Sequence, residues 1–385
     1  MLGAEEVPSD DCTKAMDQIL GFTKKKNAPF SAGVTISIND SRTFEELQPL
    51  QSQVAGHSAG NGKSSLGMLL HPDGYILKPV EEKAQGESEI RFYQHLNSAV
   101  DEVSQELREF VPTFYGILNV KFNEKDIPCI ILQNVTEGML EPCVMDVKIG
   151  KQTWEPSASE EKKNIERVKY VASKRECGFC IPGMQYYDIA SQKLVKYGKE
   201  YGKQLDRNGI KETLKLFLNW RSSLSHPLIL LFLWKLWKIL RWFQSQRQFL
   251  FYSSSVLFVY DAHILRNYSN TMAVFDENSS EGTSSQCTQV HDISTFLKDF
   301  KTSYHPIDDA ERHSIEEKEH GFKNFDELEK HISPEGNRNA NKLAHVKMID
   351  FAHTLISSKC DIDFNYIEGL RNLVEIFEIL LKESC

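Results

Sequence analysis

Three features are scarce in this sequence, and each scarcity excludes a class of protein. No stretch reaches the roughly 18 apolar residues that a membrane-spanning helix needs, so we do not expect a transmembrane protein. Positive charge is in deficit, because 45 Lys and Arg stand against 54 Asp and Glu, which gives a net charge of −9 at pH 7. We therefore expect no nucleic-acid partner, and an anionic ligand must meet a local group of basic side chains.

Cysteine is also sparse and irregularly spaced. The eight cysteines of the 385 residues form no regular framework, and the first residues lack the apolar region of a secretory signal. We expect reduced thiols and a cytoplasmic or nuclear location. Cys177 and Cys180 form a C-x-x-C motif without a second pair at zinc-binding spacing, so we expect no metal or redox role for it.

A phosphate-binding P-loop is missing as well. Gly62-Lys63-Ser64 resembles the end of that motif, which requires another glycine five positions before Gly62. His57 occupies that position, so the P-loop enzymes are excluded.

The most informative stretch that is present covers residues 142–150, Pro-Cys-Val-Met-Asp-Val-Lys-Ile-Gly. Its apolar residues predict a buried strand, and Asp146 and Lys148 are two residues apart, so both point to the same side. A carboxylate beside a cation suits phosphoryl transfer, in which a hydroxyl is held and a moving phosphate is neutralised. A strand with a surface Asp and Lys has the same spacing, and the spacing alone leaves both interpretations open.

A second pair of charged residues lies earlier in the chain. The turn Pro72-Asp-Gly74 predicts a hairpin whose second strand ends at Lys78. An amphipathic helix follows, with Ile90, Tyr93, Leu96 and Val100 on one face and Glu89 in its first turns. In kinases, a strand lysine paired with a helix glutamate positions the nucleotide phosphates.

Three motifs occur in an order that resembles the inositol polyphosphate kinase family. The stretch 142–150 matches the family's P-x-x-x-D-x-K-x-G signature, residues 254–260 are similar to S-S-L-L-x-x-Y, and Ile349-Asp350-Phe351 is similar to the family's metal-binding I-D-F motif. The similarity extends over residues 53–380, with unlike sequence between 262 and 340. The sequences of these motifs are most similar to those of the multikinase branch of the family.

The resemblance implies an α+β fold of two lobes, related to the ATP-grasping lobes of protein kinases. We expect a mobile N-terminal extension at residues 1–50, a small nucleotide-binding lobe at 51–135 and a larger lobe with the inositol phosphate site at 136–385. Residues 262–340 are rich in Ser, Asn, Asp and Glu, which predicts a disordered insertion in the larger lobe.

The resemblance also implies a function. We expect an ATP- and Mg²⁺-dependent kinase that phosphorylates hydroxyls of inositol tris- and tetrakisphosphates towards the pentakisphosphate, with a phosphoinositide lipid headgroup as a further substrate. The alternatives are an inositol hexakisphosphate kinase that forms pyrophosphates, which Ile165-Glu166 keeps open, and a catalytically inactive scaffold of the same fold. We expect a monomer.

The implied site residues fall into three groups. Asp146 and Lys148 are the catalytic candidates, although Asp146 could serve either the ribose or the acceptor hydroxyl. Asp350 is the metal-ligand candidate. The ATP-binding candidates are Lys78, Glu89, Gln133, Val135, Asp146, Leu257 and Asp350. The substrate-binding candidates are Lys148, Lys162, Lys169 and His353.

Two further segments have local predictions. Ser157 and Glu160 form a capping box that starts a helix, on which Lys162 and Lys169 share a face two turns apart. An apolar stripe that includes Leu236 and Phe243 alternates with Lys235, Lys238 and Arg241. We expect the stripe to face the core, and a membrane surface is the alternative.

Overall fold

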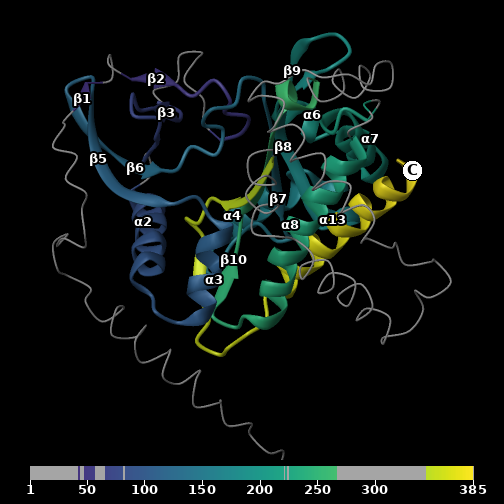
Figure 1. Ribbon diagram of the computed structural model, residues 1–385. Coiled ribbons are helices and arrows are strands. Elements are labelled where there is room, and N and C mark those ends of the chain that lie inside the picture. Colours follow the sequence, from purple (N-terminus) through teal and green to yellow (C-terminus); the bar gives the residue numbers. More distant parts are fainter. Residues whose placement is uncertain are drawn as a thin grey trace, which may run out of the picture.

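The computed structural model describes residues 42–43, 47–56, 66–80, 83–220, 222, 225–266 and 344–384. These residues form two lobes, each built on its own sheet, with helices covering the larger one (Figure 1). The predicted insertion lies outside the described residues except for residues 262–266, and so does the P-loop-like stretch at 57–65. Most of the predicted N-terminal extension also lies outside them.

The small lobe contains a six-stranded sheet in the order β1-β5-β6-β4-β3-β2. Its strands are β1 (Arg42–Thr43), β2 (Gln48–Pro49), β3 (Leu69–Leu70), β4 (Ile76–Pro79), β5 (Phe114–Phe122) and β6 (Lys125–Leu132). The predicted hairpin is confirmed: β3 and β4 pair antiparallel, and Gly74 takes a φ of +89° in the turn between them. β1 and β2 belong to this sheet although they precede residue 51.

Two helices follow β4, namely α2 (Lys83–Ser98) and α3 (Glu102–Phe110). Ile90, Tyr93 and Leu96 are buried on α2 as their spacing predicts. Val100 was predicted to continue this face, but α2 ends at Ser98 and Val100 is 74% exposed. Asp101 then caps α3 by accepting a hydrogen bond from the Ser104 amide.

The larger lobe is organised around an antiparallel five-stranded sheet in the order β12-β11-β7-β8-β9. Its strands are β7 (Pro142–Ile149), β8 (Phe179–Asp188), β9 (Lys193–Tyr197), β11 (Ser255–Asp261) and β12 (Ala344–Ile349). The central strand β7 carries the predicted charged pair. A smaller sheet joins β10 (Phe249–Phe251) to β13 (Thr354–Ile356), just beyond the ends of β11 and β12.

Six described helices surround these sheets: α4 (Glu160–Val168), α5 (Val171–Cys177), α6 (Lys199–Gly202), α7 (Arg207–Phe217), α8 (Ser225–Ser245) and α13 (Phe364–Glu383). The predicted capping box at Ser157 is wrong, because Ser159 is the N-cap of α4 and its hydroxyl accepts from the Lys162 amide at 3.2 Å. The side chains of both serines suit the N-cap position, and the extended backbone that an N-cap residue adopts occurs at Ser159.

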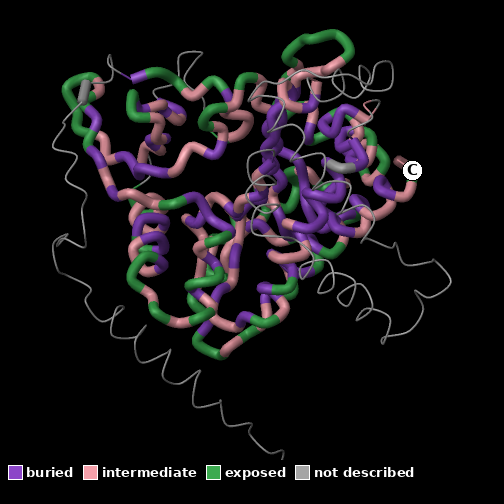
Figure 2. The backbone as a smooth tube through the Cα atoms, in the orientation of Figure 1, coloured by how far each residue is buried: buried purple, intermediate pink, exposed green. Residues whose placement is uncertain are grey.

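Helix α8 combines the apolar run at 228–234 and the predicted stripe into one 21-residue helix. Both are buried against α13 and β12, so the prediction that the stripe faces the core is confirmed (Figure 2). Lys235 and Lys238 lie over the ring of Trp234, at 5.3 and 4.7 Å from its centroid, and Arg241 is exposed. Within the described chain, no helix has the length and apolar character of a membrane span.

The cysteines agree only in part with the prediction. Cys129, Cys143, Cys177 and Cys180 are free and buried, so Cys177 and Cys180 do not form a disulfide. Cys360 is disulfide-bonded, and the prediction of reduced thiols is wrong for this residue. It follows a tight turn after β13, far from the C-x-x-C motif in sequence.

We predict that Phe232→Ala on α8 lowers the free energy of unfolding by about 3–5 kcal/mol, because it empties a fully buried site. The Phe232 ring packs against the rings of Phe217, Phe258 and Phe377. Urea denaturation followed by circular dichroism measures the loss. Phe364→Ala is the matched control, because Phe364 is 68% exposed and should change stability by about 0.5 kcal/mol or less. Equal losses in the two variants would contradict the burial of α8.

Candidate active site

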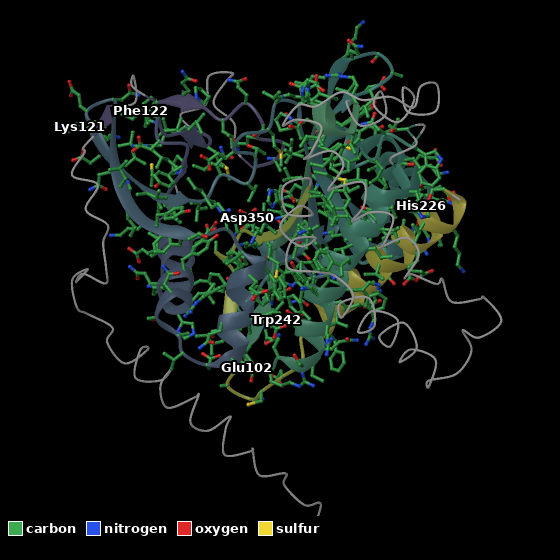
Figure 3. All side chains as sticks on the ribbon, in the orientation of Figure 1. Glu102, Lys121, Phe122, His226, Trp242 and Asp350 are labelled. Atoms are coloured by element: carbon green, nitrogen blue, oxygen red, sulfur yellow. The ribbon has the colours of Figure 1, made fainter. Side chains whose placement is uncertain are left out.

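A cavity of about 400 Å³ lies between the two lobes. Its walls come from residues 52–56, β4, α2, the segment after β6, β7, β11 and the turn after β12. Nine of the predicted site residues line it, namely Lys78, Glu89, Gln133, Val135, Asp146, Lys148, Leu257, Asp350 and His353. Lys162 and Lys169 are not among its lining residues. Asp350 lies at the junction of the lobes (Figure 3).

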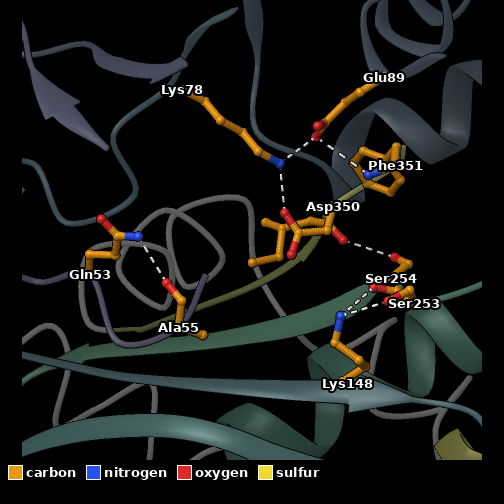
Figure 4. A network of polar contacts seen from close by, with 10 residues as sticks. Gln53, Ala55, Lys78, Glu89, Lys148, Ser253, Ser254, Asp350 and Phe351 are labelled. Atoms are coloured by element: carbon orange, nitrogen blue, oxygen red, sulfur yellow. Dashed lines mark hydrogen bonds and ion pairs between the residues drawn. The ribbon is translucent and has the colours of Figure 1, made fainter. Parts of the chain in front are cut away.

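Lys78 connects the two lobes across this cavity. Its Nζ atom lies 2.8 Å from Oε1 of Glu89 on α2 and 2.6 Å from Oδ1 of Asp350 after β12 (Figure 4). The predicted contact between Lys78 and Glu89 is thus present, and the contact with Asp350 was not foreseen. Burial lowers the pKa of Lys78, but the charges of Asp350 and Glu89 outweigh it and raise the pKa above its usual value. Lys78 therefore stays protonated.

Asp350 and Asp146 are close enough to affect each other's ionisation. Burial and then the charge of Asp350 raise the pKa of Asp146 to about 6. Burial also raises the pKa of Asp350, but Lys78 and Lys148 outweigh it, so the net shift is downward. The buried Oδ1 atom of Asp146 accepts no hydrogen bond from the described part of the chain. This region carries an excess of negative charge next to an unsatisfied carboxylate oxygen.

The backbone around Asp350 is strained. Asp350 has a φ of +64°, which residues other than glycine rarely adopt, and it directly follows the last residue of β12. The Ser254 hydroxyl donates to the Ile349 carbonyl at 2.9 Å and ties this turn to β11. In this conformation the carboxylate of Asp350 reaches Lys78 in the cavity.

Lys148 is held at the other side of the cavity. Its ammonium group donates to the carbonyl oxygen and the hydroxyl of Ser253, both at 2.8 Å (Figure 4). A bulge interrupts the pairing of β7 with β8 between Asp146 and Lys148. The motif thus places a carboxylate and a cation along one wall of the cavity.

The segment after β6 forms an apolar slot at one end of the cavity. Val135, Val144 and Val259 are buried together there, and Leu257 packs against them. The Gln133 amide donates to the Thr113 carbonyl at 2.9 Å, and the Asn134 side chain accepts from Thr136 at 2.8 and 3.0 Å. The Asn134 side chain thus closes a turn next to the apolar slot.

Residues 51–56, which we call the strap, close the cavity from the small lobe. Lys196 and Lys199 of the larger lobe donate to the carbonyls of Gln51 and Gly56, at 2.7 and 2.9 Å. The Val54 carbonyl approaches Gly183 of β8 so closely that a Cβ atom there would lie 1.9 Å from it. Gly183 pairs directly with Asp146 across the sheet. Sequence reasoning missed these contacts, since no local pattern links the strap to β8 and β9.

The three acceptor-site candidates outside β7 differ in their surroundings. His353 lines the cavity, and its Nδ1 atom lies 2.5 Å from Oε1 of Glu155. Lys162 is half-buried in the first turn of α4. Lys169 was predicted on the same helical face, but α4 ends at Val168, so Lys169 lies past its end with extended backbone.

Known proteins match this arrangement at the family level. A family model described as inositol polyphosphate kinase matches residues 129–378, which include all three motifs. The chain belongs to the inositol polyphosphate kinase family.

Relatives within this family cover most of the chain. An inositol polyphosphate multikinase of Rattus norvegicus is 31% identical over 372 residues, covering 86% of this chain and 92% of the relative. One of Homo sapiens is 30% identical over 381 residues, covering 86% and 88%. The structure of inositol phosphate multikinase Ipk2 from S. cerevisiae with ADP and Mn²⁺ has a TM-score of 0.50 at 20% identity, covering 79% of this chain and 97% of that one. This structural likeness supports the two-lobed α+β fold.

We predict that Gly183→Ala displaces the strap, because the added methyl group meets the backbone of Val54 instead of a side chain that could move. Hydrogen exchange of the strap amides should become faster, as should exchange of the Met68 amide, which bonds to the Gln53 side chain at 2.9 Å. Gly198→Ala is the control, since nothing lies within 4 Å of its added Cβ. Unchanged exchange in Gly183→Ala would show that the strap does not rest on β8.

Proposed function

We propose that this chain is an ATP-dependent kinase that transfers the γ-phosphoryl group to hydroxyls of inositol tris- and tetrakisphosphates, towards the pentakisphosphate. The observation that carries the proposal is the convergence of Lys78, Asp146, Lys148 and Asp350 from both lobes on one cavity. The multikinase relatives that cover 86% of the chain support the choice of acceptor.

The order of groups along β7 supports a definite placement of ATP. Val144, Asp146 and Lys148 lie on one side of the strand, with about 6–7 Å between successive members. Val144 belongs to the apolar slot, which suits adenine, with main-chain atoms of 133–135 at its edge. The ribose then lies beside Asp146 and the phosphates lie towards Lys148 and Lys78. We therefore assign Asp146 to the ribose rather than to the acceptor hydroxyl.

The carboxylates of this cavity fit a divalent cation. Asp350 and Asp146 are oxygen ligands of the kind that Mg²⁺ prefers, and burial together with the charge of Asp350 raises the pKa of Asp146. Among the described residues, no group of three or more His, Cys, Asp or Glu could hold a metal ion by itself. We assign Asp350 as the protein ligand of Mg²⁺, which supplies charge neutralisation on the nucleotide phosphates. The ADP and Mn²⁺ in the yeast multikinase structure support the use of a nucleotide with a divalent cation.

The remaining cations act on the transferred group. Lys78 is protonated and, held by Glu89, can hold a nucleotide phosphate in place. Lys148 is anchored by Ser253 and stabilises the charge that develops on the moving phosphoryl group. Lys148, Lys162, Lys169 and His353 are assigned to the acceptor phosphates, with Lys162 and Lys169 outside the cavity wall.

The finer predictions are kept as part of this proposal. We place the lobe boundary at residue 135, three residues after β6 ends at Leu132, and we propose a cytoplasmic or nuclear monomer. A phosphoinositide headgroup shares the chemistry of the acceptor. Because the apolar face of α8 is buried, the basic residues 235–241 offer no apolar surface for insertion into a lipid bilayer.

Product analysis with Mg-ATP tests the proposal. We predict phosphorylation of inositol tris- and tetrakisphosphates, and a loss of about a hundredfold or more in kcat for Asp350→Ala with retained fold. Asp126→Ala, at the exposed start of β6, should leave the rate unchanged. Turnover of hexakisphosphate alone would assign the chain to the pyrophosphate-forming branch. No turnover of any acceptor would favour the inactive scaffold.

A further inference from the structure

Two of the basic side chains assigned to the acceptor, those of His353 and Lys169, are paired with carboxylates of one short segment. His353 Nδ1 lies 2.5 Å from Glu155 Oε1, and Lys169 Nζ lies 2.6 Å from Glu166 Oε1. Both glutamates are largely buried, with side-chain exposures of 25% for Glu155 and 20% for Glu166. An acceptor phosphate that reaches either side chain therefore meets a carboxylate at the same place.

Glu166 is fixed by two almost fully buried residues. Its Oε2 atom accepts a hydrogen bond from the Thr153 hydroxyl at 3.1 Å, and its main-chain carbonyl accepts one from Lys174 Nζ at 2.6 Å. Thr153 is 3% exposed and Lys174 is 4% exposed. Such a carboxylate cannot simply swing into solvent when a ligand arrives, since its contacts would be left unsatisfied.

The two glutamates lie beside the phosphoryl-transfer centre. Tyr170 is close enough to both Asp146 and Glu166 for their charges to act on it, and Lys174 is likewise close to Lys148. His353 itself lines the cavity next to Asp350. No residue from 153 to 166 lines the cavity itself, so Glu155 meets an acceptor through His353 and Glu166 meets it through Lys169.

We infer that Glu155 and Glu166 are specificity residues that limit how many phosphates an acceptor carries when it binds. This inference rests on the proposed kinase function. A hydroxyl of the inositol ring can donate a hydrogen bond to either carboxylate, whereas a phosphate at the same position is repelled by it. Acceptors with few phosphates are favoured, and each further phosphate near these glutamates lowers binding.

Neutral isosteres test this inference. Glu155→Gln and Glu166→Gln keep the size and one acceptor oxygen of each side chain and remove its charge. We expect the ratio of kcat/KM for tetrakisphosphate over trisphosphate to rise about three- to fivefold in at least one variant, the effect of a charge contact worth up to about 1 kcal/mol. The Kd of hexakisphosphate, measured by calorimetry, should fall by a similar factor, while the KM for ATP stays unchanged.

Glu160→Gln is the matched control. Glu160 lies on the same helix α4 and pairs with Lys163 at 2.8 Å, but it is 73% exposed on the solvent side. The Glu160→Gln substitution removes the same charge without touching the acceptor site, so the selectivity of this variant should equal that of the wild type. If the ratio of kcat/KM for tetrakisphosphate over trisphosphate stays unchanged in both test variants, or shifts equally in Glu160→Gln, this inference is overturned while the proposed kinase function stands. A wild type inactive on every inositol phosphate would overturn the proposed function and this inference with it.

Discussion

The cavity depends on one cation that two lobes share. Glu89 is almost fully buried in the small lobe and Asp350 comes from the larger lobe, and Lys78 neutralises both. Removing Lys78 would leave these carboxylates uncompensated beside Asp146, whose pKa is already raised by burial and by Asp350. The relative position of the lobes at the cavity is thus coupled to the charge of one lysine, the same lysine that we assign to the nucleotide phosphates.

Basic side chains of the site are already paired before a ligand is considered. Lys148 binds Ser253, His353 contacts Glu155, and Lys196 binds the strap carbonyl of Gln51. An acidic chain with a net charge of −9 can hold an anionic ligand in this way, because its local cations are fixed by neutral or acidic partners that the ligand replaces. The cost of replacing each partner then decides which ligand binds, which is the physical basis of selectivity at Glu155 and Glu166.

The sequence predicted those parts of the site that depend on local pattern. The turn before Lys78, the helix of Glu89 and the strand of Asp146 and Lys148 follow from turn chemistry and periodicity, whereas Asp350 was linked to them only by motif resemblance. Other parts depend on contacts between distant segments and left no local signal, including the strap against Gly183 and the pairs of Glu155 and Glu166. Helix α8 was not predicted as a whole, since its part at 228–234 is buried on every side and lacks an amphipathic pattern.

A crystal structure with Mn²⁺ and a non-hydrolysable ATP analogue tests the central claim most directly. The account predicts an anomalous Mn²⁺ signal in contact with the carboxylate of Asp350, adenine in the slot of Val135 and Leu257, and a nucleotide phosphate on Lys78. A metal ion away from Asp350, or a nucleotide bound outside the cavity between the lobes, would contradict it.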